Sequence, residues 1–161
     1  MSNRLSIGDV FEVDLAESLV GFFQYVARDS SQLNSHVVRV FRERFKRDEN
    51  PDAGKIVRGE VEFYAHVFVS VGVKQGYWKK VAREDIVGDV DVLFRNSSDY
   101  GKSKEKTSDS WFVWKIDGPY KRIGPLSAPY RSAEIGVVVP PDSLVYRMAH
   151  GVYDFFYPEP A

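Results

Sequence analysis

The chain has 161 residues, a formal net charge of −1 and no cysteine. A chain of this length is typical of one domain, so we expect residues 1–161 to form a single unit. The absence of cysteine excludes disulfide scaffolds, Cys-ligated zinc sites, iron–sulfur clusters and thiol nucleophiles. The balanced charge disfavours a general nucleic-acid binder, because such proteins usually carry a basic excess.

Aromatic side chains are abundant, with 11 Phe, 9 Tyr and 3 Trp in the chain. They favour pleated, half-buried strands, and they are also enriched at protein interfaces. The first residues, MSNRLSIGDVF, lack the apolar core of a signal peptide, and no apolar run is long enough for a membrane span. We therefore expect a β-rich protein that stays in the cytoplasm and does not bind membranes.

The N-terminal half predicts antiparallel strands. Alternating apolar and polar residues indicate one strand over residues 9–15, and a stretch rich in aromatic residues indicates a second over 20–28, joined to the first as a hairpin. A polar loop over 29–35 leads to a strand over 37–41, and residues 46–59 are expected to be a loop because they contain proline and glycine.

The clearest pattern lies in the middle of the chain. Every odd position from Val61 to Val73 is apolar, which predicts one long strand. Residues 76–82 are expected to form a turn or a helical turn. The sequence thus predicts that the sheet extends through residue 73 and that the chain reverses after it.

The C-terminal half predicts shorter elements. A strand over 91–95, a mobile polar loop over 96–110, and paired strands over 111–116 and 120–124 follow one another. Trp111 and Trp114 are an odd number of positions apart, so we expect one in the core and the other near the surface.

The last segments are a strand over residues 133–139, a helix that starts at Pro140-Pro141 and ends before Gly151, and a strand-like tail over 152–157. Together these elements predict an α+β fold dominated by β structure. We expect a mainly antiparallel twisted sheet or partly open barrel with one or two short helices.

No pattern of catalytic or metal-binding residues is present. His36, His66 and His150 lack metal-site spacing, although a meeting of His36 and His66 across neighbouring strands stays open. There is no GxSxG, P-loop or dinucleotide glycine motif. We expect no catalytic residue, no metal and no cofactor.

Two groups of side chains are candidates for binding a partner. A basic run includes Arg39, Arg42 and Arg44, which suits a phosphate or an acidic partner, or alternatively a solvated edge strand whose charges block edge pairing. The other group is aromatic and polar and lies in or beside the loop over 29–35. It consists of Gln24, Tyr25, Asp29, Gln32 and Asn34.

Three stretches carry a resemblance. They are IGDVFEVDL with GFFQYVARDSSQLNSHVVRVF, EVEFYAHVFVSVGVKQGYWKKV, and SWFVWKI with IGVVVPPDSLVYRMAHGVY. They resemble the immunity protein 26 family of bacterial polymorphic toxin systems from about Ile7 to Tyr157, with a low-complexity departure over residues 102–110. The resemblance implies an α+β protein without catalysis or cofactor that protects its cell by binding a cognate toxin domain. It carries no motif that assigns binding residues.

Two other function classes fit the sequence. One is a nucleic-acid or oligosaccharide binding β module that uses exposed aromatic side chains as stacking platforms. The other is a small enzyme with a carboxylate site at Glu62 or Asp85. The sequence predicts no oligomeric state and does not identify the toxin.

Overall fold

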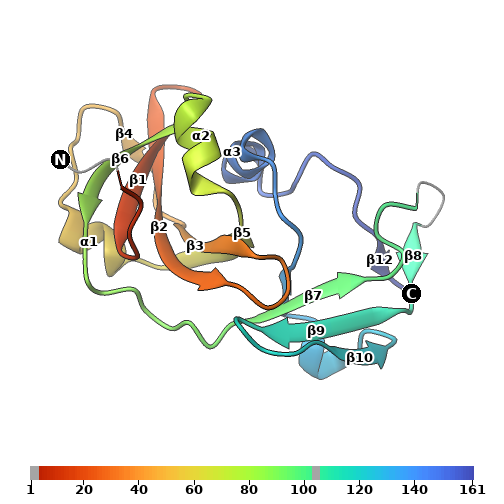
Figure 1. The fold of residues 1–161 in the computed structure, drawn as a ribbon. Coiled ribbons are helices and arrows are strands. Elements are labelled where there is room, and N and C mark those ends of the chain that lie inside the picture. Colours follow the sequence, from red (N-terminus) through yellow and green to blue (C-terminus); the bar gives the residue numbers. More distant parts are fainter. Residues whose placement is uncertain (1–3, 103–105) are drawn as a thin grey trace.

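The computed structural model describes residues 4–102 and 106–161, and its largest element is a curled, antiparallel sheet (Figure 1). The strand order is β5-β3-β2-β1-β6, and β4 pairs with β2 off this path. The strands are β1 (Asp9–Asp14), β2 (Leu19–Asp29), β3 (Ser35–Phe41), β4 (Phe45–Lys46), β5 (Val61–His66) and β6 (Trp78–Arg83).

A second sheet has the order β10-β9-β7-β11 and lies beside the first (Figure 1). Its pairs are antiparallel except for the parallel pair β11–β7, and a separate parallel pair joins β12 to β8. These strands are β7 (Leu93–Ser97), β8 (Thr107–Ser108), β9 (Trp111–Lys115), β10 (Lys121–Gly124), β11 (Glu134–Ile135) and β12 (Glu159–Pro160).

The helices are short. They are α1 (Ala53–Val57), α2 (Val69–Lys74), α3 (Pro141–His150) and the 3-10 turn η1 (Ala128–Tyr130). α2 and α3 contact each other beside the first sheet (Figure 1). The fold is α+β and dominated by β structure, as predicted; the described residues form no closed barrel and contain three α-helices rather than one or two. None of the helices over these residues has the length and apolarity that a membrane crossing requires.

Local sequence signals place several elements correctly. The β1–β2 hairpin closes through a tight turn in which Glu17 and Ser18 both have positive φ, the geometry that matches the twist of antiparallel strands. α3 begins after Pro140 and ends at Gly151, whose φ of 85° is left-handed and whose N–H donates to the Arg147 carbonyl. The strands predicted over 37–41 and 120–124 are present as β3 and β10.

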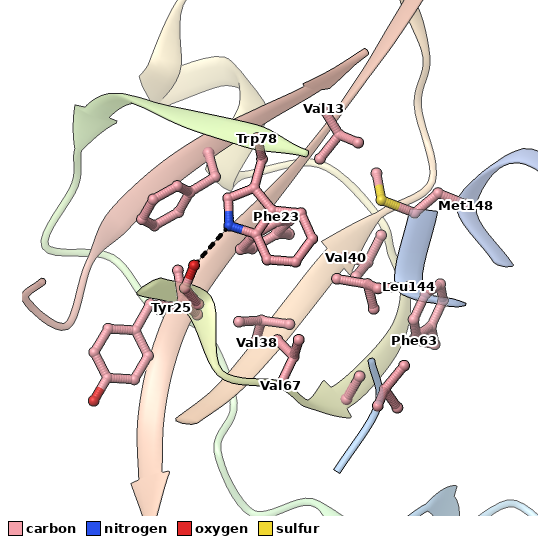
Figure 2. Packing of buried hydrophobic residues seen from close by; sticks show 14 of the residues in the cluster. Val13, Phe23, Tyr25, Val38, Val40, Phe63, Val67, Trp78, Leu144 and Met148 are labelled. Carbon is pink, nitrogen blue, oxygen red and sulfur yellow. Dashed lines mark hydrogen bonds between the residues drawn. The ribbon is translucent and has the colours of Figure 1, made fainter. Parts of the chain in front are cut away.

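The long strand predicted through Val73 is wrong. β5 ends at His66, and the valines from Val69 onward belong to α2. Trp78 explains the change, because it begins β6 where a turn was predicted and its indole nitrogen donates to the Val69 carbonyl at 2.9 Å (Figure 2). A Cβ on Gly72 would lie only 1.9 Å from the Trp78 ring, so the helix approaches the ring through its glycine.

Substitution of Gly72 by alanine should lower the free energy of unfolding by about 1–3 kcal/mol, because the added methyl group overlaps the Trp78 ring. In the absence of this overlap alanine would stabilise the helix by up to about 1 kcal/mol, so the sign of the effect is informative. Urea denaturation measures it, with Ser70→Ala on an exposed position of the same helix as the control. Equal stabilities of both variants would contradict this packing.

Four more predictions from the sequence need correction. Residues 46–59 contain α1, whose first turn Asp52 caps by accepting from the Lys55 N–H. The strand predicted over 133–139 is reduced to β11, and the segment 152–157 is not a strand. Both Trp111 and Trp114 are buried, because their strand is covered on its two faces.

Buried side chains join the layers. The largest cluster packs Phe23 and Trp78 against Leu144 and Met148 of α3 (Figure 2). Another cluster combines Val26 and Val37 of the first sheet with Phe94 and Trp114 of the second. The two sheets therefore share apolar core.

The predicted mobile loop has strands at both of its ends. β7 runs to Ser97, and β8 contains Ser108, whose hydroxyl donates to Asp99 at 2.7 Å. Residues 103–105 of this loop lie outside the described residues.

Candidate docking surface

Arg39 and Gln24, two predicted binding residues, meet inside the fold. Arg39 Nε and Nη2 donate to Gln24 Oε1 at 2.9 and 2.7 Å, and Nη2 also donates to the carbonyls of Val57 and Ile86. The Gln24 amide in turn donates to backbone oxygens at the turn before β1 and after β6. Burial lowers the pKa of Arg39. These contacts hold five segments of the chain together and leave the pair inaccessible to a partner.

The other arginines of the basic run do not form one patch with Arg39. Arg44 pairs with Glu62 and donates to the Met148 carbonyl, both at 3.0 Å, so it links β5 to α3. Arg42 is exposed and pairs with Glu60 at 3.3 Å. The edge-strand interpretation is wrong for Arg39, because β3 lies between β2 and β5.

Asp29 is the centre of a second buried network. Its Oδ2 accepts from His66 Nε2 at 2.8 Å and from Trp114 Nε1 at 2.9 Å, and its Oδ1 accepts from the Asp117 N–H at 3.1 Å. Burial raises the pKa of Asp29, but these hydrogen bonds outweigh it and hold the pKa below its usual value. Burial lowers the pKa of His66 despite the bond to Asp29, so we assign a neutral imidazole that donates to the carboxylate.

An aspartate–histidine pair also occurs in catalytic sites, but both of these side chains are fully buried. The pair therefore ties the first sheet to β9 rather than facing a substrate. His36 does not share a ligand with His66, since its Nδ1 accepts from the Val69 N–H at 3.3 Å. Within the described ranges, no three His, Asp or Glu side chains are grouped so that they could hold a metal ion.

The remaining candidates are Tyr25 within β2, and Gln32 and Asn34 in the turn between β2 and β3. Tyr25 is buried and its ring packs on His36. Gln32 donates to the Gly118 carbonyl at 3.0 Å, and exposed Asn34 accepts from Arg28 at 2.8 Å. The predicted aromatic and polar group is therefore divided between the core and this turn.

A pocket beside α2 is the feature that sequence reasoning missed. It has a volume of about 610 Å³ and lies between the N-terminal segment, β1, β6 and α2. Its apolar side chains are Leu5, Phe11, Val69 and Val73, and its polar ones are Arg4, Asp9, Ser70, Lys74, Lys79 and Lys80. Among the described residues, four cationic groups and one carboxylate thus line the pocket, although the net charge of the chain is −1.

The lysines of the pocket differ in their pairing. Lys80 pairs with buried Asp9 at 3.0 Å, and Lys79 pairs with Glu12 at 3.4 Å. Lys74, at the end of α2, has no carboxylate within ion-pair distance over residues 4–102 and 106–161. The pocket therefore carries positive charge that the described part of the chain does not neutralise.

α2 exposes apolar side chains on both of its flanks. Val69 and Gly72 face the core, Val73 (45% exposed) borders the pocket, and Phe68 and Val71 (41% and 39% exposed) lie on the opposite flank. We call the surface formed by α2 and the preceding Phe68 the α2 ridge; its exposed apolar residues are Phe68, Val71 and Val73. Exposed apolar side chains that are bordered by polar groups are typical of protein-binding surfaces.

The sequence held a signal for this surface. Val71, Val73 and Lys74 lie in the stretch SVGVKQGYWKK, together with both other pocket lysines. The period-2 pattern concealed it, because a strand would have placed all the odd-numbered valines on one buried face. Only the packing of Gly72 on Trp78 turns Val71 and Val73 toward solvent.

Comparisons with known proteins add no assignment. No family model matches the chain. No curated protein matches it, and no solved structure does. The resemblance to the immunity protein 26 family therefore stays a prediction.

Proposed function

We propose that this protein is a cytoplasmic immunity protein that neutralises a cognate bacterial toxin domain by noncovalent binding. The observation that carries the proposal is the α2 ridge, which exposes Val73 beside a pocket with a basic rim and Val71 on its other flank. The family resemblance supports the same function.

The α2 ridge suits binding because it is preorganised. The hydrogen bond from Trp78 to the Val69 carbonyl and the close approach of Gly72 fix the helix against the core. A surface that is ordered before binding loses little conformational entropy in the complex. No histidine is among the described residues that line the pocket, so Ser70 has no neighbouring base there.

The alternative of a stacking module has fewer platforms than the composition indicated. Trp78, Trp111 and Trp114 are all buried. The exposed aromatic side chains are phenylalanines and tyrosines that lie outside the strands, on loops, in α3 and in the C-terminal segment: Phe68, Tyr77, Tyr100, Tyr120, Tyr146 and Phe156.

The test uses the toxin domain encoded beside the gene for this protein. Wild-type protein should bind that purified domain in calorimetry and protect cells that express it. Val71→Asp should weaken binding at least 30-fold, because it places a charge in the apolar ridge. Val90→Asp is the matched control, since Val90 is similarly exposed (41%) in the segment between β6 and β7.

Absence of a complex with wild-type protein would contradict the proposed function. Salt-sensitive binding to single-stranded DNA or RNA in its place would favour the stacking module. A complex that Val71→Asp leaves intact would move the interface away from the α2 ridge.

A further inference from the structure

We propose that the pocket beside α2 receives an acidic segment of the toxin, with one apolar side chain on the pocket floor and a neighbouring carboxylate on Lys74. This inference rests on the proposed function and assigns the chemistry of the partner. It is carried by the juxtaposition of an apolar floor with unneutralised positive charge.

The floor can accept an apolar side chain. Val73 is 45% exposed and Leu5 is half-buried, while Phe11 and Val69 close the pocket beneath them. The volume of about 610 Å³ is within the range of sites that enclose small ligands, so one or two side chains fit. A partner group that fills it removes Val73 from water, which is favourable.

The rim selects a negative partner. Lys80 forms an ion pair with Asp9, and Lys79 forms one with Glu12. Lys74 lies at the exposed end of α2, where no carboxylate of the described residues is within ion-pair distance. A carboxylate from the partner would complete the charge balance of the rim, and the same lysines would repel a basic segment.

A polypeptide fits this site better than a nucleic acid. Aromatic side chains that stack on bases are missing from the pocket's surface, because Phe11, the aromatic residue among the described lining residues, is 2% exposed. A phosphate backbone also prefers an extended basic stripe, and the chain as a whole is slightly acidic.

The test compares Lys74→Glu with Lys121→Glu, an exposed charge reversal on β10 in the other sheet. Against the adjacent-gene toxin domain in low salt, Lys74→Glu should raise Kd at least 10-fold and slow association, while Lys121→Glu should stay within about 2-fold of wild type. Lys74→Arg should retain binding because it keeps the charge. A carbodiimide should couple Lys74 directly to a toxin Asp or Glu, which mass spectrometry identifies.

A last experiment substitutes lysine for the toxin Asp or Glu that crosslinks to Lys74. This charge reversal should restore binding of the toxin to the Lys74→Glu variant. If wild-type protein forms no complex, the proposed function and this inference both fail. If the complex forms but Lys74→Glu binds as wild type and Lys74 does not crosslink, only the pocket assignment fails. The pocket assignment would also be overturned, in favour of a nucleic acid, if single-stranded DNA displaced the toxin from wild-type protein and Lys74→Glu abolished the binding of that DNA.

Discussion

Replacement of Asp29 by alanine should lower the free energy of unfolding by about 3–5 kcal/mol, since two buried donors lose their acceptor at about 1–3 kcal/mol each and a third, partly buried donor loses it at a smaller cost. These donors are the N–H groups of His66, Trp114 and Asp117. Asp29→Asn should cost less, because its amide oxygen still accepts. Urea denaturation at neutral pH measures both losses, and a change below about 1 kcal/mol for Asp29→Ala would contradict the role of this network.

The same network predicts that acid destabilises the protein. The pKa of His66 in the fold lies below its ordinary value of 6.5, so the unfolded chain takes up a proton first as the pH falls. Stability from neutral His66 is therefore complete above about pH 6.5 and is lost below it. The pKa of Asp29 is also lowered in the fold, so its contribution is lost at still lower pH, below its ordinary 3.8.

His66→Gln isolates the contribution of His66. Glutamine keeps an N–H donor for Asp29 but does not titrate. The pH dependence that comes from other groups is therefore the same in both proteins and cancels in the comparison. One of these groups is Glu134, whose pKa is raised by burial. The advantage of the wild type over His66→Gln should shrink between pH 7 and pH 5. A difference that is constant over this range would show that His66 does not titrate in the unfolding equilibrium.

Replacement of Arg39 by methionine should also cost about 3 kcal/mol or more. Methionine fills most of the volume, but it leaves Gln24 Oε1 and the carbonyls of Val57 and Ile86 without their donor. Arg42→Met is the matched control from the same basic run; because Arg42 is exposed, its effect should stay within about 0.5 kcal/mol.

Thermal unfolding of the two arginine variants distinguishes a structural from an interface role. Arg39→Met should lower Tm by several degrees, whereas Arg42→Met should leave Tm nearly unchanged. If Arg39→Met had the stability of the wild type but lost toxin binding, Arg39 would belong to the interface as the basic run first indicated.

The sequence by itself determined the elements whose cause is local. The β1–β2 hairpin follows from alternation before a short polar link and an aromatic-rich stretch after it, and α3 follows from Pro140-Pro141 at its start and Gly151 at its end. These patterns depend on neighbours within a few residues, so they also predict the α+β class.

Tertiary structure alone decided where the polar candidates lie. Arg39 and Gln24 are 15 residues apart, and they meet inside the sheet because β2 and β3 pair in a register that places them opposite each other. A charged side chain in a basic run is usually exposed, so burial of Arg39 required partners that no local pattern reveals. The same holds for Asp29, whose three donors come from β5, β9 and the residues after β9.

The candidate surface depends on one such long-range contact. Alternating valines are compatible with a strand, and nothing local distinguishes Val71 and Val73 from core residues. The contact of Gly72 with the Trp78 ring makes this segment a helix docked by its glycine face, which leaves the two valines and Lys74 outside. The sequence thus determined which residues of this segment are apolar, and the packing of α2 on β6 decided which of them face solvent.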